Sequence, residues 1–132
     1  MMRPVLKNTH MLLILVLSFT TTVAAVTAQE DRTRRIRFAR GSSTAVVEDA
    51  VIRGTRDRYL LKARAGQTMT VRITSVEDNA EFDIYPSRGK KPLEGAYEVT
   101  DWTGKLPRSG DYVIEVGPTR GNASYRLEVT IR

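Results

Sequence analysis

The sequence predicts an all-β protein, a single antiparallel β-sandwich of about eight short strands with little helix. Apolar and polar residues alternate in most segments, which is typical of strands with one buried and one exposed face. The last segment shows this most clearly, because every second residue from Ala123 to Ile131 is apolar. No segment repeats its apolar residues with the 3.6-residue period of a helix. Turn-forming residues separate the segments at intervals of about 8–12 residues, as in sandwiches and barrels.

The first 28 residues are predicted to be a secretory signal peptide that is cleaved after Ala28. Arg3 and Lys7 precede the apolar run from Met11 to Phe19, and small residues follow it. The run is short for a membrane span, which needs about 20 apolar residues, and an uncleaved anchor is the alternative. We therefore expect a periplasmic or secreted protein whose one domain covers residues 29–132.

Four strands are predicted in the first half of the domain, at residues 35–39, 44–53, 58–65 and 68–75. In the second of them Glu48 and Asp49 interrupt the apolar pattern, so we expect that strand to be bulged or broken. The residues expected to face the core are Ile36 and Phe38, then Tyr59, Leu61 and Ala63, and then Met69, Val71 and Ile73.

The second half predicts strands at residues 81–85, 102–106, 112–116 and 123–131. The last two flank a turn at residues 117–122, and we interpret them as a closing hairpin with a long exposed loop. Residues 86–95 form a polar excursion, and at most a turn or two of helix is expected near residues 93–99. Trp102 and the five tyrosines are expected in the core or at its edge, with ligand stacking by Trp102 as the alternative.

The chain has no cysteine, and its one histidine, His10, lies in the predicted signal peptide. Disulfides, cysteine nucleophiles, Ser-His triads, imidazole acid–base catalysis and ordinary zinc sites are therefore excluded from the mature domain. Removal of Arg3 and Lys7 with the signal peptide leaves a net charge of +4. The sequence predicts no cofactor and no metal, and it predicts a protein that is not an enzyme.

Three clusters of polar residues each allow two interpretations. The arginines at 32, 34, 35, 37 and 40 suit an anionic surface such as lipopolysaccharide or acidic glycan, or the exposed face of an edge strand, which we prefer. Residues 77–79 with Glu81 and Asp83 offer oxygen ligands for Ca²⁺, or form a solvated loop, which we prefer. Ser109 near Lys105 resembles a nucleophile with its base, but a turn at Ser109 and Gly110 explains it better.

Several short stretches match a known family in consistent order over nearly the whole mature domain. They are Ile36-Arg37-Phe38, Gly41-Ser42-Ser43, Ile52-Arg53-Gly54, Tyr59, Ala65-Gly66-Gln67, Leu106-Pro107-Arg108-Ser109-Gly110-Asp111-Tyr112, Thr119-Arg120 and Tyr125-Arg126-Leu127-Glu128-Val129. Together they resemble the periplasmic inhibitors of g-type (goose-type) lysozyme, which are small exported β-sandwich proteins. The stretch from Leu106 to Tyr112 also resembles the pre-peptidase C-terminal domains of secreted bacterial enzymes.

The resemblance implies a protein partner, with g-type lysozyme as the candidate, and loops that enter the enzyme's substrate cleft. It implies that Arg120 meets the acidic catalytic groups there, because a guanidinium offers a planar fork that matches a carboxylate. The other residues expected to bind the partner are Thr119, Thr55, Arg56, Arg108 and Ser109. The chain departs from the family pattern at Thr55, where an aromatic residue is expected, and at Ser124, where a second arginine is expected.

No nucleic acid is expected as a partner, because the protein is exported, and we expect a monomer that does not span the membrane after cleavage. The alternative function is that of a non-catalytic module of the cell envelope, of the pre-peptidase C-terminal type. A net charge of +4 would give no long-range attraction toward a basic lysozyme.

Overall fold

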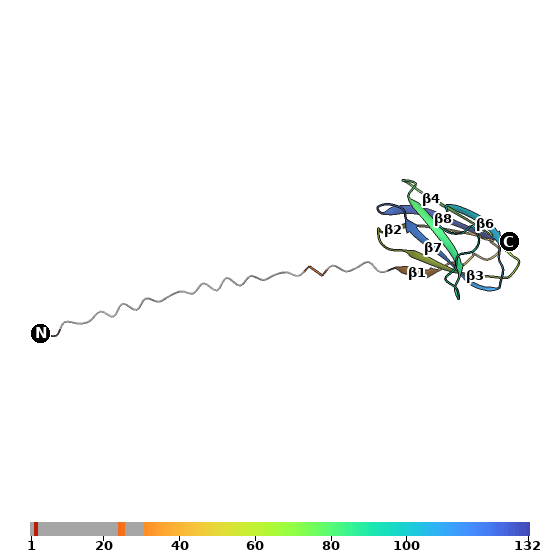
Figure 1. Ribbon diagram of the computed structural model, residues 1–132, viewed down its shortest axis with the longest axis horizontal. Helices are drawn as coiled ribbons and strands as arrows, with labels where there is room; N and C mark the ends of the chain where they lie inside the picture. Colours follow the sequence, from red (N-terminus) through yellow and green to blue (C-terminus); the bar gives the residue numbers. More distant parts are fainter. Residues whose placement is uncertain (1, 3–23, 26–30) are drawn as a thin grey trace.

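The described residues form two four-stranded sheets that face each other (Figure 1). The computed structural model describes Met2, Ala24, Ala25 and residues 31–132, so the predicted signal peptide and its cleavage site lie almost wholly outside the described part. In spatial order, the first sheet contains β1 (Arg32–Arg35), β3 (Asp57–Ala63), β7 (Gly110–Pro118) and β5 (Ala80–Pro86). The second contains β2 (Thr44–Val51), β8 (Ala123–Ile131), β4 (Thr68–Ser75) and β6 (Asp101–Lys105).

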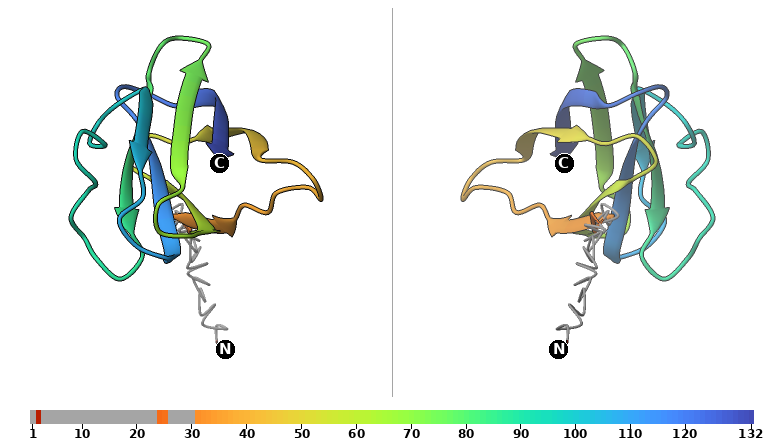
Figure 2. Two further views of the ribbon diagram at one scale, coloured as in Figure 1. Left: turned by 90° about the vertical axis from the view of Figure 1, so that its right-hand side faces the viewer. Right: turned by 90° about the vertical axis from the view of Figure 1, so that its left-hand side faces the viewer.

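The predicted all-β sandwich is confirmed, and every strand pair in it is antiparallel except β1 with β3, which is parallel. Figure 2 shows the same strands from the two sides of the view in Figure 1. The described part contains no helix, so the turn of helix allowed near residues 93–99 is absent. That segment instead runs beside β5, where Val99 and Phe82 exchange backbone hydrogen bonds of 2.9 and 3.1 Å. Among the described residues, no helix has the length and apolar character needed to span a bilayer.

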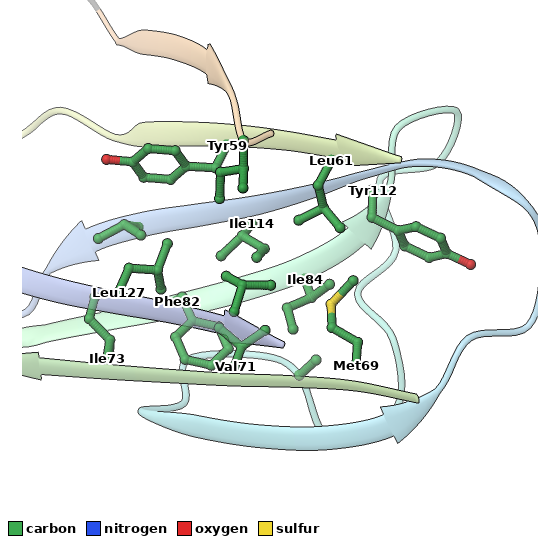
Figure 3. Packing of buried hydrophobic residues seen from close by; sticks show 14 of the residues in the cluster. Tyr59, Leu61, Met69, Val71, Ile73, Phe82, Ile84, Tyr112, Ile114 and Leu127 are labelled. Atoms are coloured by element: carbon green, nitrogen blue, oxygen red, sulfur yellow. The ribbon is translucent and has the colours of Figure 1, made fainter. Parts of the chain in front are cut away.

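The core lies between the sheets and is built from the alternating apolar positions (Figure 3). The inward faces predicted for β3 and β4 are confirmed, since Leu61, Met69 and Val71 are fully buried and their neighbours are partly or fully exposed. Phe82 and Leu127 reach the same core from β5 and β8. Trp102 packs at the edge of this core, as expected, and its indole N–H donates to the Glu94 carbonyl.

Two predictions near the N-terminus are wrong. The first strand ends at Arg35 rather than spanning residues 35–39, and Ile36 then turns into the core while its N–H donates to the Leu60 carbonyl. Strand β2 is continuous rather than bulged or broken, because it pairs with β8 residue by residue. The apolar alternation fails in β2 because Asp49 occupies an inward position, where Arg34 pairs with it at 2.6 Å.

The predicted closing hairpin is also wrong. Strands β7 and β8 follow each other in the chain, but β7 belongs to the first sheet and β8 to the second. The loop between them therefore crosses from one layer to the other and is not a hairpin turn. Each strand sits in the middle of its sheet, which is why both carry long apolar faces.

The sandwich has two ends, which we name after the arginines that they carry. The Arg120 end contains the connections at residues 52–56, 76–79 and 119–122. The Arg108 end contains the connections at residues 36–43, 64–67 and 106–109 and, at the right of Figure 1, the C-terminus. Strand β7 runs from one end to the other, and its nine residues span about 27 Å at about 3.4 Å per residue.

Candidate partner-binding surface

Asn79, which is only 1% exposed, and Asn122 together fasten the three loops at the Arg120 end. The side-chain N–H groups of Asn79 donate to the backbone carbonyls of Arg120 (3.0 Å) and Asn122 (2.9 Å). The backbone carbonyl of Asn79 accepts from the Thr119 N–H (2.9 Å). The Asn122 side chain in turn accepts from the Arg53 N–H at 2.9 Å. The last loop is therefore held to both neighbouring turns before any partner arrives.

The acidic segment at residues 77–79 thus serves the loop structure. The Asn79 amide group is committed to two loop carbonyls, which it contacts as a donor. Asp78 adopts a left-handed backbone with φ of 51°, and its N–H donates to the Ser75 carbonyl at 3.2 Å. Within the described residues, no group of three histidine, cysteine, aspartate or glutamate residues is arranged to hold a metal ion.

Arg120 itself is exposed on this anchored loop. One guanidinium nitrogen, Nη2, donates to the Glu77 carbonyl at 2.5 Å. A guanidinium has five N–H donors in a fixed fork, and a contact to a neutral carbonyl leaves its positive charge uncompensated. Arg120 is therefore oriented by the neighbouring turn while it can still bind an external carboxylate.

Other predicted contact residues gather around Arg120. Thr119 is exposed beside it, and a hollow of about 390 Å³ joins this loop to the turn at Arg53 and Gly54. Arg56 lies on the outer face of the first sheet, against Gly117, where a side chain at residue 117 would collide with the guanidinium. Thr55 is less available, because its hydroxyl donates to the Ile52 carbonyl at 2.8 Å and so closes its own turn.

Arg108 and Ser109 lie at the opposite end of the sandwich. Ser109 Oγ accepts from the Ala65 N–H at 2.9 Å, which ties the residue to the connection between β3 and β4. Arg108 and Ser109 were expected to bind the same partner as Thr55 and Arg56, but the length of β7 separates the two groups. A partner that binds the loops at one end of the sandwich would therefore not contact the loops at the other end.

The N-terminal arginines hold β1 in place. Arg32 makes two hydrogen bonds to Asp57, of 2.9 and 2.8 Å, and Arg35 makes two to Asp111, of 2.9 and 2.8 Å. Arg34 pairs with Asp49, which also accepts from the Ala50 N–H at 2.7 Å. Burial of Asp49 opposes this, but these bonds together hold the pKa of its carboxyl below the ordinary value. These contacts support the role of an edge strand over that of a surface for anionic ligands.

Sequence reasoning missed two residues of the Arg120 end. Asn79 had the appearance of an ordinary loop residue, and nothing in the sequence marks it as buried. Val76 projects from the turn after β4 and is 89% exposed. In the sequence, Val76 could be noticed only as a single valine beside charged residues, and single apolar residues are common in exposed loops.

Comparisons with known proteins place the chain through its fold. No protein-family model and no curated protein matches the chain. Among solved structures, Aeromonas hydrophila PliG, a periplasmic lysozyme inhibitor of g-type lysozyme, matches with a TM-score of 0.67 and 30% identity, over 79% of this chain and 100% of that one. Salmonella Typhimurium PliG, with the same description, matches with a TM-score of 0.62 and 21% identity, over 76% and 98%.

The pre-peptidase C-terminal domain of a Bacillus anthracis collagenase matches with a TM-score of 0.56 and 12% identity, over 80% of this chain and 99% of that one. At this identity the likeness concerns the fold alone. The Aeromonas inhibitor, in contrast, combines 30% identity with coverage of its whole length. The chain therefore belongs to the family of periplasmic inhibitors of g-type lysozyme, whose members act on an enzyme and are not enzymes themselves.

Proposed function

We propose that the protein inhibits g-type lysozyme in the periplasm by placing its Arg120 end in the enzyme's substrate cleft. The single observation that supports this most is an exposed guanidinium on a loop that buried Asn79 holds in place. Glycosidases keep essential carboxylates in a cleft. An arginine whose backbone is already ordered loses less conformational entropy when it binds such a carboxylate.

The surroundings of Arg120 combine an exposed apolar side chain with polar residues, as a small protein–protein interface does. Val76 offers an exposed apolar side chain on the adjacent turn, and Thr119 and Arg53 border the hollow. Binding energy in protein interfaces concentrates in a few central residues that a rim shields from water. Arg120 and Val76 would be such central residues, and the loops around them would form the rim.

An inhibition assay with paired variants tests this proposal. The mature protein is titrated against g-, c- and i-type lysozymes, and inhibition of the g-type enzyme is expected. Arg120→Ala should weaken inhibition by about 2 kcal/mol, because a carboxylate buried by the complex would lose its partner. Arg120→Lys should recover part of this loss, since an ammonium cannot form the two-pronged contact.

Arg108→Ala is the matched control, because it removes the same charge from the opposite end and should inhibit like the wild type. Thermal unfolding of each variant separates lost binding from a disturbed loop, since Arg120 also bonds to the Glu77 carbonyl. If Arg108→Ala loses inhibition and Arg120→Ala keeps it, the proposed end is wrong. If the wild type leaves g-type lysozyme active at micromolar excess, the envelope-module function replaces inhibition.

A further inference from the structure

A hollow at the Arg108 end is lined mainly by basic side chains. Its volume is about 690 Å³. Four separate segments contribute its positive charges, which are Arg35 at the end of β1, Lys62 on β3, Arg88 after β5 and Arg108 before β7. One carboxylate, Asp111, also lines the hollow. Ser87, Ser109 and Gly110 lie near the arginines, and Pro86 and Tyr112 complete the lining.

The carboxylate in this hollow is already neutralised. Asp111 accepts two hydrogen bonds from the Arg35 guanidinium, at 2.9 and 2.8 Å. These bonds, and the nearby charge of Lys62, hold the pKa of the Asp111 carboxyl below its ordinary value. Within residues 31–132, no ion pair involves Lys62, Arg88 or Arg108. Three cations thus border the same hollow without an ion pair of their own among residues 31–132.

The backbone around Arg108 is fixed from below by Tyr112, which is only 1% exposed. The Tyr112 hydroxyl donates to the Arg108 carbonyl at 2.6 Å and lies 3.3 Å from the Arg108 N–H, which donates to it. Across the hollow, the Ser87 N–H donates to the Asp111 carbonyl at 2.9 Å, which ties the base of the Arg88 turn to β7. Both arginines therefore extend from backbone that is held in place.

We propose that this hollow binds a phosphate group of an anionic ligand. A phosphate has several charged oxygens that can meet three cations at once, and guanidinium groups match phosphate geometry in two-pronged contacts. The four basic side chains of the lining favour a charged head group over an apolar chain. The site lies about 27 Å from the Arg120 end, so the protein could hold such a ligand while its other end stays open to a protein partner.

Nuclear magnetic resonance titration with inorganic pyrophosphate tests the site directly. At low salt, the amide signals of Ser87, Ser109, Gly110 and Asp111 should shift and reach saturation. The variant Arg88→Gln/Arg108→Gln should weaken the apparent affinity about tenfold, as expected for the loss of two exposed charge contacts. The matched control Arg53→Gln/Arg72→Gln also loses two exposed arginines, but neither lines the hollow, and its affinity should stay within about twofold of the wild type.

Sedimentation with vesicles distinguishes the source of the phosphate. If vesicles containing phosphatidylglycerol retain the wild type and release the Arg88→Gln/Arg108→Gln variant, the ligand is a lipid head group. If pyrophosphate binds at the hollow and the vesicles do not, the ligand is a soluble phosphate compound. The proposal is overturned if the shifts scatter over all basic surfaces, or if the two double variants bind equally. Lysozyme inhibition should be the same in the wild type and in Arg88→Gln/Arg108→Gln, so a failure here is separate from a failure of the inhibitory function.

Discussion

At the scale of single residues, a chain of hydrogen bonds passes from the first sheet to the second and back, and it ends on a buried carboxylate. Arg34 donates to the Tyr59 hydroxyl at 3.3 Å, Tyr59 contacts the Tyr125 hydroxyl, and Tyr125 donates to Asp57 at 2.7 Å. Asp57 is 2% exposed and also receives two bonds from Arg32. A buried carboxylate is tolerated only when its oxygens are satisfied, and here both oxygens accept.

This chain of bonds predicts alkaline instability. Burial raises the pKa of both Tyr59 and Tyr125 above the ordinary value of 10.0. Their contribution to stability is fully present below pH 10, where the unfolded chain also keeps its protons, and it is lost as the pH rises above that value. The free energy of unfolding should then fall by ~1.4 kcal/mol per pH unit for each tyrosine that stays protonated in the folded protein.

Tyr125→Phe isolates this effect. The variant should be less stable at pH 7 by about 1–3 kcal/mol, since Asp57 loses a donor. Above pH 10 its stability should fall less steeply than that of the wild type, because one of the two buried hydroxyls is gone. Urea denaturation at pH 8, 10 and 11 measures both quantities. Equal slopes in the two proteins would contradict the assignment.

At the scale of elements, β8 has the most demanding position in the fold. It pairs with β2 on one side and with β4 on the other, and its inner face meets the core of the sandwich. Leu127 is fully buried in the middle of this strand. Arg126, on the opposite face, is about half exposed and pairs with Glu48 and Glu128 at 3.7 and 3.0 Å.

Substitutions at these two neighbours should therefore differ strongly. Leu127→Ala should lower the free energy of unfolding by about 2–5 kcal/mol, because it leaves a cavity in a core that has no disulfide to support it. Arg126→Ala should lower it by about 0.5 kcal/mol or less, because exposed ion pairs contribute little. Chemical denaturation with a common m-value makes the comparison. If Arg126→Ala lost more unfolding free energy than Leu127→Ala, the assignment of the inward face of β8 would be wrong.

Alternation allowed the inner faces of β3, β4 and β8 to be predicted from the sequence, because it reflects local burial. It could not identify strand partners, so the loop at residues 119–122 was mistaken for a hairpin although it joins the two sheets. Asp49 was misread for a related reason: its arginine partners come from β1, which belongs to the other sheet. At the candidate site, Arg120, Thr119 and Arg56 do lie at one end, whereas Asn79 was missed because its burial depends on the loops that it joins.

At the scale of the whole molecule, the two ends of the sandwich are electrically separate under cellular conditions. About 27 Å of strand lies between them, whereas charges in water are screened beyond about 8 Å at 0.15 M salt. A single buried core joins the two sheets. The Arg108 end can therefore influence an event at the Arg120 end only through the net charge, and only at low salt.

This separation predicts how the charge variants respond to salt when a basic g-type lysozyme is the partner. At 0.15 M salt, Arg88→Gln/Arg108→Gln should have the same association rate constant and the same inhibition constant as the wild type. At about 0.01 M salt the screening length grows to about 30 Å. The variant should then associate faster, because it has lost two of the positive charges that repel a basic enzyme. Surface plasmon resonance over this range of salt measures both constants. A weaker inhibition constant at 0.15 M would mean that the Arg108 end contacts the enzyme, and the one-ended mode of binding would then be wrong.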